Sequence, residues 1–321
     1  MSEAKIFTRE EIPGDEFKDS LTGNDLLKIL TTCPAKWKYD EKDRYKKSSF
    51  GLTAHTMMLD SETFDRTFFR MPGRDDYEGE VLASVASLQG WLKERGVGGR
   101  SKSDPFELIS IIKATCETSG EAVPFFWHEI ERTAIQLCGA SEPVSAKDFD
   151  TVKRMRAVLL ANEQWAGVVE TGIKQATICC ELMGVPVRVR IDNMADDAKL
   201  WDYTTTTNAE PGFFIRNAFN IGHDLKLAMQ YHAFHKAHGI KPEGVFMLAQ
   251  ETTAPFLAAE LQMTEAMFAI GTAKLKQALA IYKAARDSDV WASYNGGNTI
   301  QMDPPQYVMQ QYKHLFHEEP K

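Results

Sequence analysis

The stretch from Lys174 to Gly239 constrains the fold of this chain more than any other. A run of residues that favour β-structure, Ala176 to Cys180, meets a turn at Met183-Gly184. A second run, Val185 to Ile191, alternates apolar residues with arginine, and a third run covers Lys199 to Thr206. Runs of this length, separated by turn residues, predict neighbouring strands of one sheet.

Helices are predicted around these strands on the C-terminal side. A long amphipathic helix begins after Pro211 and is expected to cover Ile215 to His238, and a β-like run, Gly244 to Glu251, follows it. This order predicts a strand–helix–strand crossover. A further long helix is expected from Thr264 to Arg286.

The chain before Lys174 has mostly helical patterns. Asn24 or Asp25 is expected to cap a short helix, Leu26 to Thr32, and the charged segment from Ala35 to Lys47 is expected to be a solvated connector. Phe50 to Leu59 predicts a helix packed inward. Further helices are expected at Tyr77 to Arg95, Phe106 to Cys116 and Pro124 to Leu137, and after a capping serine at Ser145.

These patterns predict an α/β fold, in which a small mixed sheet is flanked by helices and preceded by a helical N-terminal arm. We expect one elaborated domain over residues 1–321, with a helical insertion at 77–140 and a core at 174–250. The apolar content of 43% and charged content of 26% are those of a globular protein. No apolar run reaches the roughly 18 residues that a membrane span needs, so no membrane association is expected.

Charge and cysteine content narrow the class of protein. The net charge of −8 disfavours a general nucleic-acid coat, although an enzyme with a local basic channel is compatible with it. The N-terminus is acidic and mixed, which is not typical of a signal peptide. The five cysteines are an odd number and contain no C-x-x-C pair, which favours reduced thiols and a cytoplasmic location.

Two aspartates are the strongest candidates for chemistry. Asp192 ends the second predicted strand and Asp202 lies in the third. Two carboxylates on neighbouring strand ends, backed by a helix, suit a hard divalent cation, although either alone is typical of a turn residue. No phosphate-binding glycine loop, dinucleotide motif or serine-hydrolase elbow is present. His55, in an apolar helix, is by itself more typical of the core, and four further histidines predict a solvated helix end: His223, His232, His235 and His238.

Five sequence features occur in a distinctive order. They are Leu26-LKILTTCPAKW with Gly51-LTAHTMMLDSETFDRTF, then Val187-RVRIDNM, Leu200-WDYTTTT, His238-Gly239-Ile240 with Val245-FMLAQETT, and Val290-WASYNGGNTIQMDPPQY. In this order the chain resembles the exonuclease VIII (RecE-type) family of phage and prophage enzymes, a branch of the PD-(D/E)xK nucleases. The resemblance covers most of the chain and has a gap at about Tyr77 to Cys138, where this protein is enlarged.

The resemblance implies a metal site formed by His55, Asp192 and Asp202, with a backbone carbonyl near Tyr203. The implied cofactor is Mg²⁺, with Mn²⁺ as a substitute, and the implied reaction is 5′→3′ exonucleolytic hydrolysis at double-stranded DNA ends by a metal-activated water. The implied partners are a single-strand annealing protein and further copies of the chain in a ring-shaped homo-oligomer. The implied location is the bacterial host cytosol.

The chain departs from the family pattern at four positions. Thr204 replaces the lysine of the D-x-K motif, and Gln175 takes the place of a glutamate before the first strand. Lys226 stands where the family has a helix glutamine, and Gln230 stands at the tyrosine position. Lys226 is therefore either a catalytic replacement that reaches the site from the helix or an exposed helix lysine. The corresponding alternative function is a catalytically inactive homologue that binds DNA or protein.

Candidate DNA contacts come from the basic residues near the two aspartates. Arg188 and Arg190 share one face of the second predicted strand, and Arg216 lies near the start of the long helix. Gln230 joins them through the family pattern. Structural ion pairs are the alternative role for the arginines.

Overall fold

A computed structural model of the chain describes residues 4–8, 11, 17–40, 49–99 and 101–315. Its centre is a six-stranded sheet in the order β1-β6-β7-β8-β9-β10. The strands are β1 (Lys5–Phe7), β6 (Ile173–Leu182), β7 (Val185–Met194), β8 (Lys199–Thr206), β9 (Gly244–Glu251) and β10 (Ala258–Gln262). Neighbours are antiparallel except for β8 and β9, which are parallel. The predicted mixed α/β fold is confirmed.

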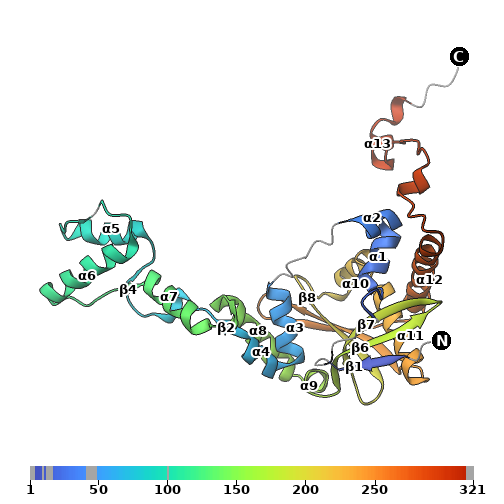
Figure 1. The fold of residues 1–321 in the computed structure, drawn as a ribbon, viewed down its shortest axis with the longest axis horizontal. Helices are drawn as coiled ribbons and strands as arrows, with labels where there is room; N and C mark the ends of the chain where they lie inside the picture. Colours follow the sequence, from blue (N-terminus) through green and yellow to red (C-terminus); the bar gives the residue numbers. More distant parts are fainter. Residues whose placement is uncertain (1–3, 9–10, 12–16, 41–48, 100, 316–321) are drawn as a thin grey trace.

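Helices cover both faces of this sheet (Figure 1). On one face lie α1 (Gly23–Thr31), α10 (Pro211–Asn220), α11 (His223–His238) and α12 (Glu265–Ser288). On the other face lie α3 (Ser49–Leu59), α8 (Ala146–Leu160) and α9 (Glu163–Glu170). The first group forms the larger apolar core, because the alternating valines of β7 point toward it. Ser145 caps α8 as predicted, since its hydroxyl accepts a hydrogen bond from the amide of Asp148.

The crossover from β8 to β9 follows the predicted order but contains two helices. The expected single helix from Ile215 to His238 is wrong, because the chain breaks at Gly222, where φ is 75°. A Cβ at this glycine would lie 2.4 Å from the side chain of Leu27 in α1. The left-handed backbone and the close approach of α1 both require glycine, so α10 ends and α11 starts anew.

The N-terminal region differs from the sequence prediction at two points. Thr22 caps α1 in place of Asn24 or Asp25, and Asp25 completes the capping box. The expected connector begins as a helix, α2 (Pro34–Tyr39), because Trp37 packs against the aromatic ring of Tyr282. Residues 41–48 of that connector lie outside the described residues. After α3 comes α4 (Ser61–Thr67).

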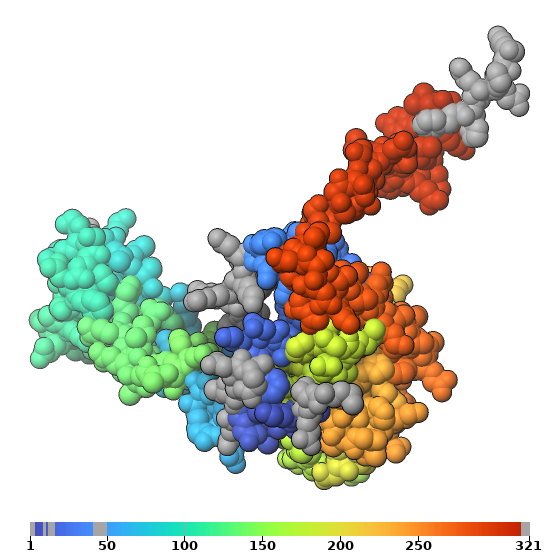
Figure 2. Space-filling view, turned by 45° about the vertical axis from the view of Figure 1, so that its right-hand side comes forward, coloured from blue at the N-terminus to red at the C-terminus, as the bar shows by residue number. Residues whose placement is uncertain are grey.

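A lobe extends from the body between β2 (Phe68–Arg70) and β5 (Glu142–Val144), which pair in parallel at its base. It contains η2 (Arg74–Asp76), β3 (Val81–Leu82), α5 (Val85–Glu94), α6 (Pro105–Ser119), β4 (Phe125–Phe126) and α7 (Trp127–Cys138). The lobe has its own apolar cluster around Trp91 and Ile112. In Figures 1 and 2 it projects away from the body of the molecule.

Two helix starts in the lobe are later than predicted. The helix expected from Tyr77 begins at Val85, because Ser84 caps it, and Val81–Leu82 pairs with β4 instead. Pro124 precedes β4 and is not in the first turn of α7, which starts at Trp127.

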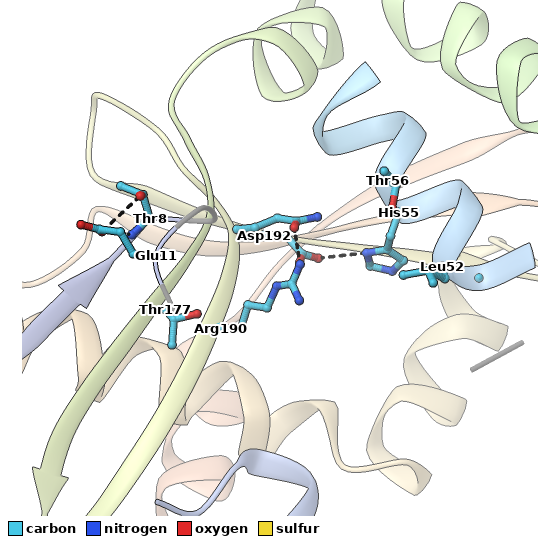
Figure 3. Close-up of a pocket in the computed structure, with 10 residues that line it drawn as sticks. Thr8, Glu11, Leu52, His55, Thr56, Thr177, Arg190 and Asp192 are labelled. Carbon is cyan, nitrogen blue, oxygen red and sulfur yellow. Dashed lines mark hydrogen bonds and ion pairs between the residues drawn. The ribbon is translucent and has the colours of Figure 1, made fainter. Parts of the chain in front are cut away.

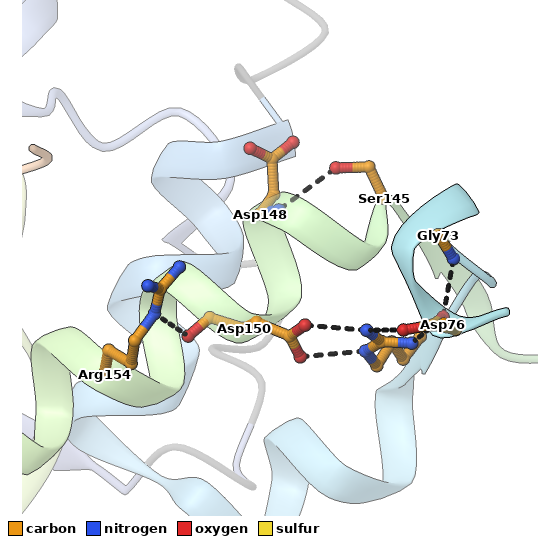
Figure 4. Close-up of polar contacts among 7 residues, drawn as sticks. Gly73, Asp76, Ser145, Asp148, Asp150 and Arg154 are labelled. Carbon is orange, nitrogen blue, oxygen red and sulfur yellow. Dashed lines mark hydrogen bonds and ion pairs between the residues drawn. The ribbon is translucent and has the colours of Figure 1, made fainter. Parts of the chain in front are cut away.

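The base of the lobe is held by a forked ion pair. The guanidinium of Arg70 contacts Asp150 of α8 and Asp76 of η2, each with N···O distances of 2.7 to 2.8 Å (Figure 4). This pairing lowers the pKa of Asp76 to about 2. The arginine therefore joins the first residues of the lobe to the body.

After α12 the chain leads away from the sheet through η3 (Tyr294–Gly297), α13 (Gln306–Gln311) and η4 (Lys313–Leu315) (Figures 1 and 2). Among the helices that the structure describes, none combines the length and apolarity needed to cross a membrane. All five cysteines are buried and none of them forms a disulfide.

Candidate active site

Asp192 and Asp202 lie where two central strands separate. β7 and β8 pair at Asn193↔Trp201 and Met194↔Leu200, so the next step of the same register sets Asp192 opposite Asp202. The strands separate from this point onward. Both carboxylates line one cavity, and they are close enough for the charge of Asp192 to act on Asp202.

Side chains take over the backbone hydrogen bonds at this fork. The amide of Tyr203 donates to Asp192 Oδ2 at 2.9 Å. The side-chain amide of Gln230, from α11, donates to Asp202 Oδ1 at 3.0 Å and to the carbonyl of Arg190 at 3.3 Å. Buried polar groups need such partners, and here the partners also fix both carboxylates in place. Gln230 is buried and also lines the cavity, and its predicted contact with DNA stays a prediction.

His55 reaches the fork from the other face of the sheet. Its Nδ1 lies 3.7 Å from Asp192 Oδ2, and its ring meets the ring of Tyr203 edge-on at 5.2 Å between centroids. In Figure 3, a dashed line joins His55 to the carboxylate of Asp192, and Arg190 comes from below in this view. The apolar helix α3 therefore places His55 at the fork, although its sequence alone resembles that of a core histidine.

Helix α11 presents a stripe of three polar residues to the same space. His223, Lys226 and Gln230 are spaced i, i+3 and i+7, which is one helix face, and all three line a cavity of about 820 Å³ together with Asp192 and Asp202. The prediction that His223 lies at a solvated helix end is wrong, because it is in the first turn of α11 and is buried. The spacing to Lys226 and Gln230 is the sequence signal that could have found it.

Lys226 points into this cavity and away from bulk solvent. Its stem passes α1 so closely that a Cβ on Gly23 would lie 3.0 Å from Lys226 Cγ. Burial lowers the pKa of Lys226, and the negative charge of Asp202 partly opposes that effect. The alternative of an exposed helix lysine does not fit this placement. Thr204 lines the same cavity.

Comparison with known proteins places the chain in a family. The family described as "PDDEXK-like domain of unknown function (DUF3799)" matches residues 26–301. The chain belongs to this family. The resemblance to PD-(D/E)xK proteins is confirmed at that level, and the exonuclease VIII branch stays a prediction.

Matches beyond the PDDEXK-like family are distant. No curated protein matches the chain. Among solved structures, the chain is similar to a provisionally assigned exonuclease from Eubacterium rectale, with 13% identity over 72% of this chain and 92% of that one and a TM-score of 0.41. It is also similar to SSO0001, with 11% identity over 63% of this chain and 77% of that one and a TM-score of 0.22. Likenesses this weak carry no argument, so the family membership alone supports a nuclease-type function.

The two aspartates of this PDDEXK-like site repel each other. Burial, together with the charge of Asp192, raises the pKa of Asp202 to about 6. Burial lowers the pKa of the nearby His223, so this imidazole does little to neutralise the pair at neutral pH. Two mutually repelling carboxylates on the wall of one cavity favour a cation bound between them.

The donors of this PDDEXK-like site fit a hard divalent cation by their chemistry, with two carboxylates and one imidazole. Among the described residues, no three His, Cys, Asp or Glu side chains converge closely enough to form a ready-made metal centre. Mg²⁺ does not require such convergence, because it keeps several waters and is commonly held by one or two carboxylates plus substrate phosphate. His55, Asp192 and Asp202 therefore remain the predicted ligands.

Positive charge lines the same PDDEXK-like cavity. Arg188 and Arg190 of β7 line it with Lys226, and within the ranges that the structure describes none of the three has a carboxylate ion-pair partner. Unpaired cations beside two acids suit an anionic ligand that also carries a metal. Arg216, predicted to join them, is exposed on α10 and is not among the residues that line the cavity.

Proposed function

We propose that this PDDEXK-like chain is a metal-dependent deoxyribonuclease. The observation that carries the proposal is the fork of β7 and β8, where Asp192 and Asp202 line one cavity and His55 Nδ1 lies 3.7 Å from Asp192 Oδ2. Lys226 lines the same cavity from α11. Acids, an imidazole and a lysine around one open cavity are the groups that phosphodiester hydrolysis uses.

The cofactor in this proposal is Mg²⁺, with Mn²⁺ as a substitute, held by His55, Asp192 and Asp202. When bound, the cation lowers the pKa of a coordinated water and neutralises charge on the phosphate. Tyr203 and Gln230 hold the two carboxylates in orientation through the hydrogen bonds already described. These contacts reduce the rearrangement that binding requires.

Lys226 replaces the missing strand lysine in this proposal. Thr204 carries no charge, whereas the ammonium of Lys226 is close enough to Asp202 to interact with it electrostatically. Its role is to stabilise the negative charge that develops on the phosphate and the attacking oxygen. Arg188 and Arg190 contact neighbouring phosphates of the substrate.

The finer assignment is an exonuclease of the exonuclease VIII type. Such an enzyme degrades double-stranded DNA from its ends in the 5′→3′ direction and passes single strands to an annealing protein, and it works as a homo-oligomer. The support is the order of matching segments, from the helix with His55 through the strands with Asp192 and Asp202 to the segment after Val290.

The decisive experiment incubates purified protein with linear duplex, labelled at either end, in the presence of Mg²⁺ or Mn²⁺. We expect release of labelled nucleotides from linear but not circular duplex, and loss of at least about 100-fold in rate for Asp192→Asn and Asp202→Asn. Asp196→Asn is a matched control, because Asp196 is exposed in the turn that joins the same two strands. Equal rates for all three variants and the wild type would exclude the proposed site.

The role of Lys226 has a separate test. Lys226→Gln should lower the rate by about 100-fold, as expected for the loss of one charge-stabilising group. Adding Thr204→Lys to that variant returns a lysine to the strand position and should restore part of the rate. Unchanged turnover in Lys226→Gln would remove Lys226 from the mechanism.

The alternative function is a catalytically inactive DNA-binding or protein-binding subunit, and Thr204 is the observation that favours it. It predicts binding to duplex without any metal-dependent cleavage, in the wild type as well as in the variants. The same labelled duplexes separate the two functions, because they report binding and cleavage independently.

A further inference from the structure

Gln175 has a backbone conformation that is unusual for its residue type. It lies in β6, its φ is 54°, and its side chain is 4% exposed. The left-handed region is unfavourable for residues with a long side chain, and such outliers concentrate at functional sites. Lys174 pairs with Asn193 and Ala176 with Ile191, so the register places Gln175 opposite Asp192.

The sheet changes its facing pattern at this same pair. Before Asp192 in the chain, Ile191 of β7 and its partner Ala176 of β6 belong to the core under α11. After Asp192, Met194 belongs to that same core. Residues of one strand face alternate sides with a period of two, so the alternation of β7 is interrupted between Ile191 and Met194. The unusual conformation of Gln175 therefore coincides with the point that exposes Asp192 to the cavity.

The side chain of Gln175 holds an arginine. Its Oε1 accepts a hydrogen bond from Nη2 of Arg190. The guanidinium lines both the cavity of about 820 Å³ and an adjoining one of about 640 Å³, which also share His55 and Asp192. Arg190 is thus fixed at the boundary between the two cavities, beside the predicted metal ligand (Figure 3).

The side-chain amide of Gln175 leaves the positive charge of Arg190 able to bind a ligand. An amide oxygen orients a guanidinium without neutralising it, whereas a carboxylate at the same place would form a bidentate ion pair. Across the described ranges of the chain, Arg190 forms no ion pair with a carboxylate. Its charge is therefore available to a ligand, and its orientation is set in advance.

We propose that Gln175 is a positioning residue, which holds the guanidinium of Arg190 beside Asp192 so that it binds a non-bridging oxygen of a nucleic-acid phosphate. This inference rests on the proposed function for the identity of the ligand. In this conformation the amide of Gln175 reaches Arg190, and the contact offsets part of the cost of the unfavourable backbone.

Two substitutions separate this role from a structural one. Gln175→Asn suits the left-handed backbone better, but its shorter side chain does not reach Arg190. Gln175→Glu keeps the length and neutralises the guanidinium. Both variants should bind a short fluorescent duplex roughly tenfold more weakly, as expected for the loss of one charge-assisted contact. The slope of log affinity against log salt should fall by about one.

The assay uses anisotropy in EDTA, so that neither cleavage nor metal binding contributes. Arg190→Gln should show the same loss, and Gln175→Asn combined with Arg190→Gln should be no weaker than Arg190→Gln alone, because one contact cannot be lost twice. Arg66→Gln is the control, since Arg66 is exposed on α4 and lines neither cavity. Gln175→Asn should keep a melting temperature at or above that of the wild type.

The outcomes are distinct from those of the cleavage experiment. Wild-type affinity in both Gln175 variants would overturn the inference, as would additive losses in the double variant or no binding by the wild type. Binding that follows the expected pattern in a chain that never cleaves DNA would refute the nuclease proposal and support the role of Gln175.

Discussion

Replacing Asp202 by asparagine should stabilise the metal-free protein while removing its activity. The pKa of this carboxyl is about 6 in the folded chain, because partial burial and the nearby charge of Asp192 disfavour its ionised form, compared with an ordinary value of 3.8 for an aspartate in water. The folded state therefore holds the proton more tightly than the unfolded state does. The contribution of Asp202 to stability is fully present below about pH 4 and is lost as the pH rises through 6.

The magnitude follows from the size of the shift. The folded and unfolded pKa values of Asp202 differ by about 2, and a difference of one in pKa corresponds to about 1.4 kcal/mol. The upper limit for the effect on the free energy of unfolding is therefore about 3 kcal/mol. The side chain of Asp202 is half-buried and opens toward the cavity, so we expect about 1 to 2 kcal/mol after screening by water. In the Asp202→Asn variant, the side-chain oxygen of the new amide would still accept the hydrogen bond from Gln230.

Urea unfolding in EDTA at two pH values measures this effect. At pH 7.5, Asp202→Asn should have a free energy of unfolding about 1 to 2 kcal/mol above that of the wild type, and the difference should shrink toward zero near pH 4. Asp196→Asn, the exposed control, should show no such trend. A difference that is the same at both pH values, or a less stable variant at pH 7.5, would refute the reasoning.

Three further predictions concern the framework around the site. Gly271→Ala should cost about 3 kcal/mol or more, measured by urea unfolding, because a Cβ there would lie 2.1 Å from the carbonyl oxygen of Asp224 and would force α12 away from α11. Arg70→Met should lower the free energy of unfolding at pH 7 by about 0.5 to 1 kcal/mol. This loss should vanish as the pH falls from about 4 to 2, because Asp76 becomes protonated there. A loss that persists at pH 2 would contradict the ion pair between Arg70 and Asp76. Cys180, whose pKa is raised by burial to about 11, should resist iodoacetamide at pH 8 until the chain is unfolded, as followed by mass spectrometry.

The strands of the core could be predicted closely from local sequence. β8 and β9 have the bounds expected from their β-prone runs, and the cap at Ser145 starts α8 where the sequence indicates. These features depend on residues within a few positions of one another, for which alternation and capping are sufficient rules. The aspartates were recognisable for a similar reason, since each lies at a fixed place in a strand.

The break at Gly222 was not predictable in the same way. Glycine inside a helical pattern is tolerated in many helices, and here the decisive contact comes from Leu27, almost 200 positions earlier. His223 was assigned to a solvated surface for the same reason, because its burial depends on how α11 packs over the sheet.

The sequence by itself determined which residues form the strands and that two acids end up on neighbouring ones, because both follow from short-range patterns of side chains along the chain. Only the tertiary structure decided that β7 and β8 part at Asp192, that Lys226 turns into the cavity, and that Gln175 holds Arg190. Those outcomes depend on register, helix packing and hydrogen bonds between distant residues, which no local pattern specifies.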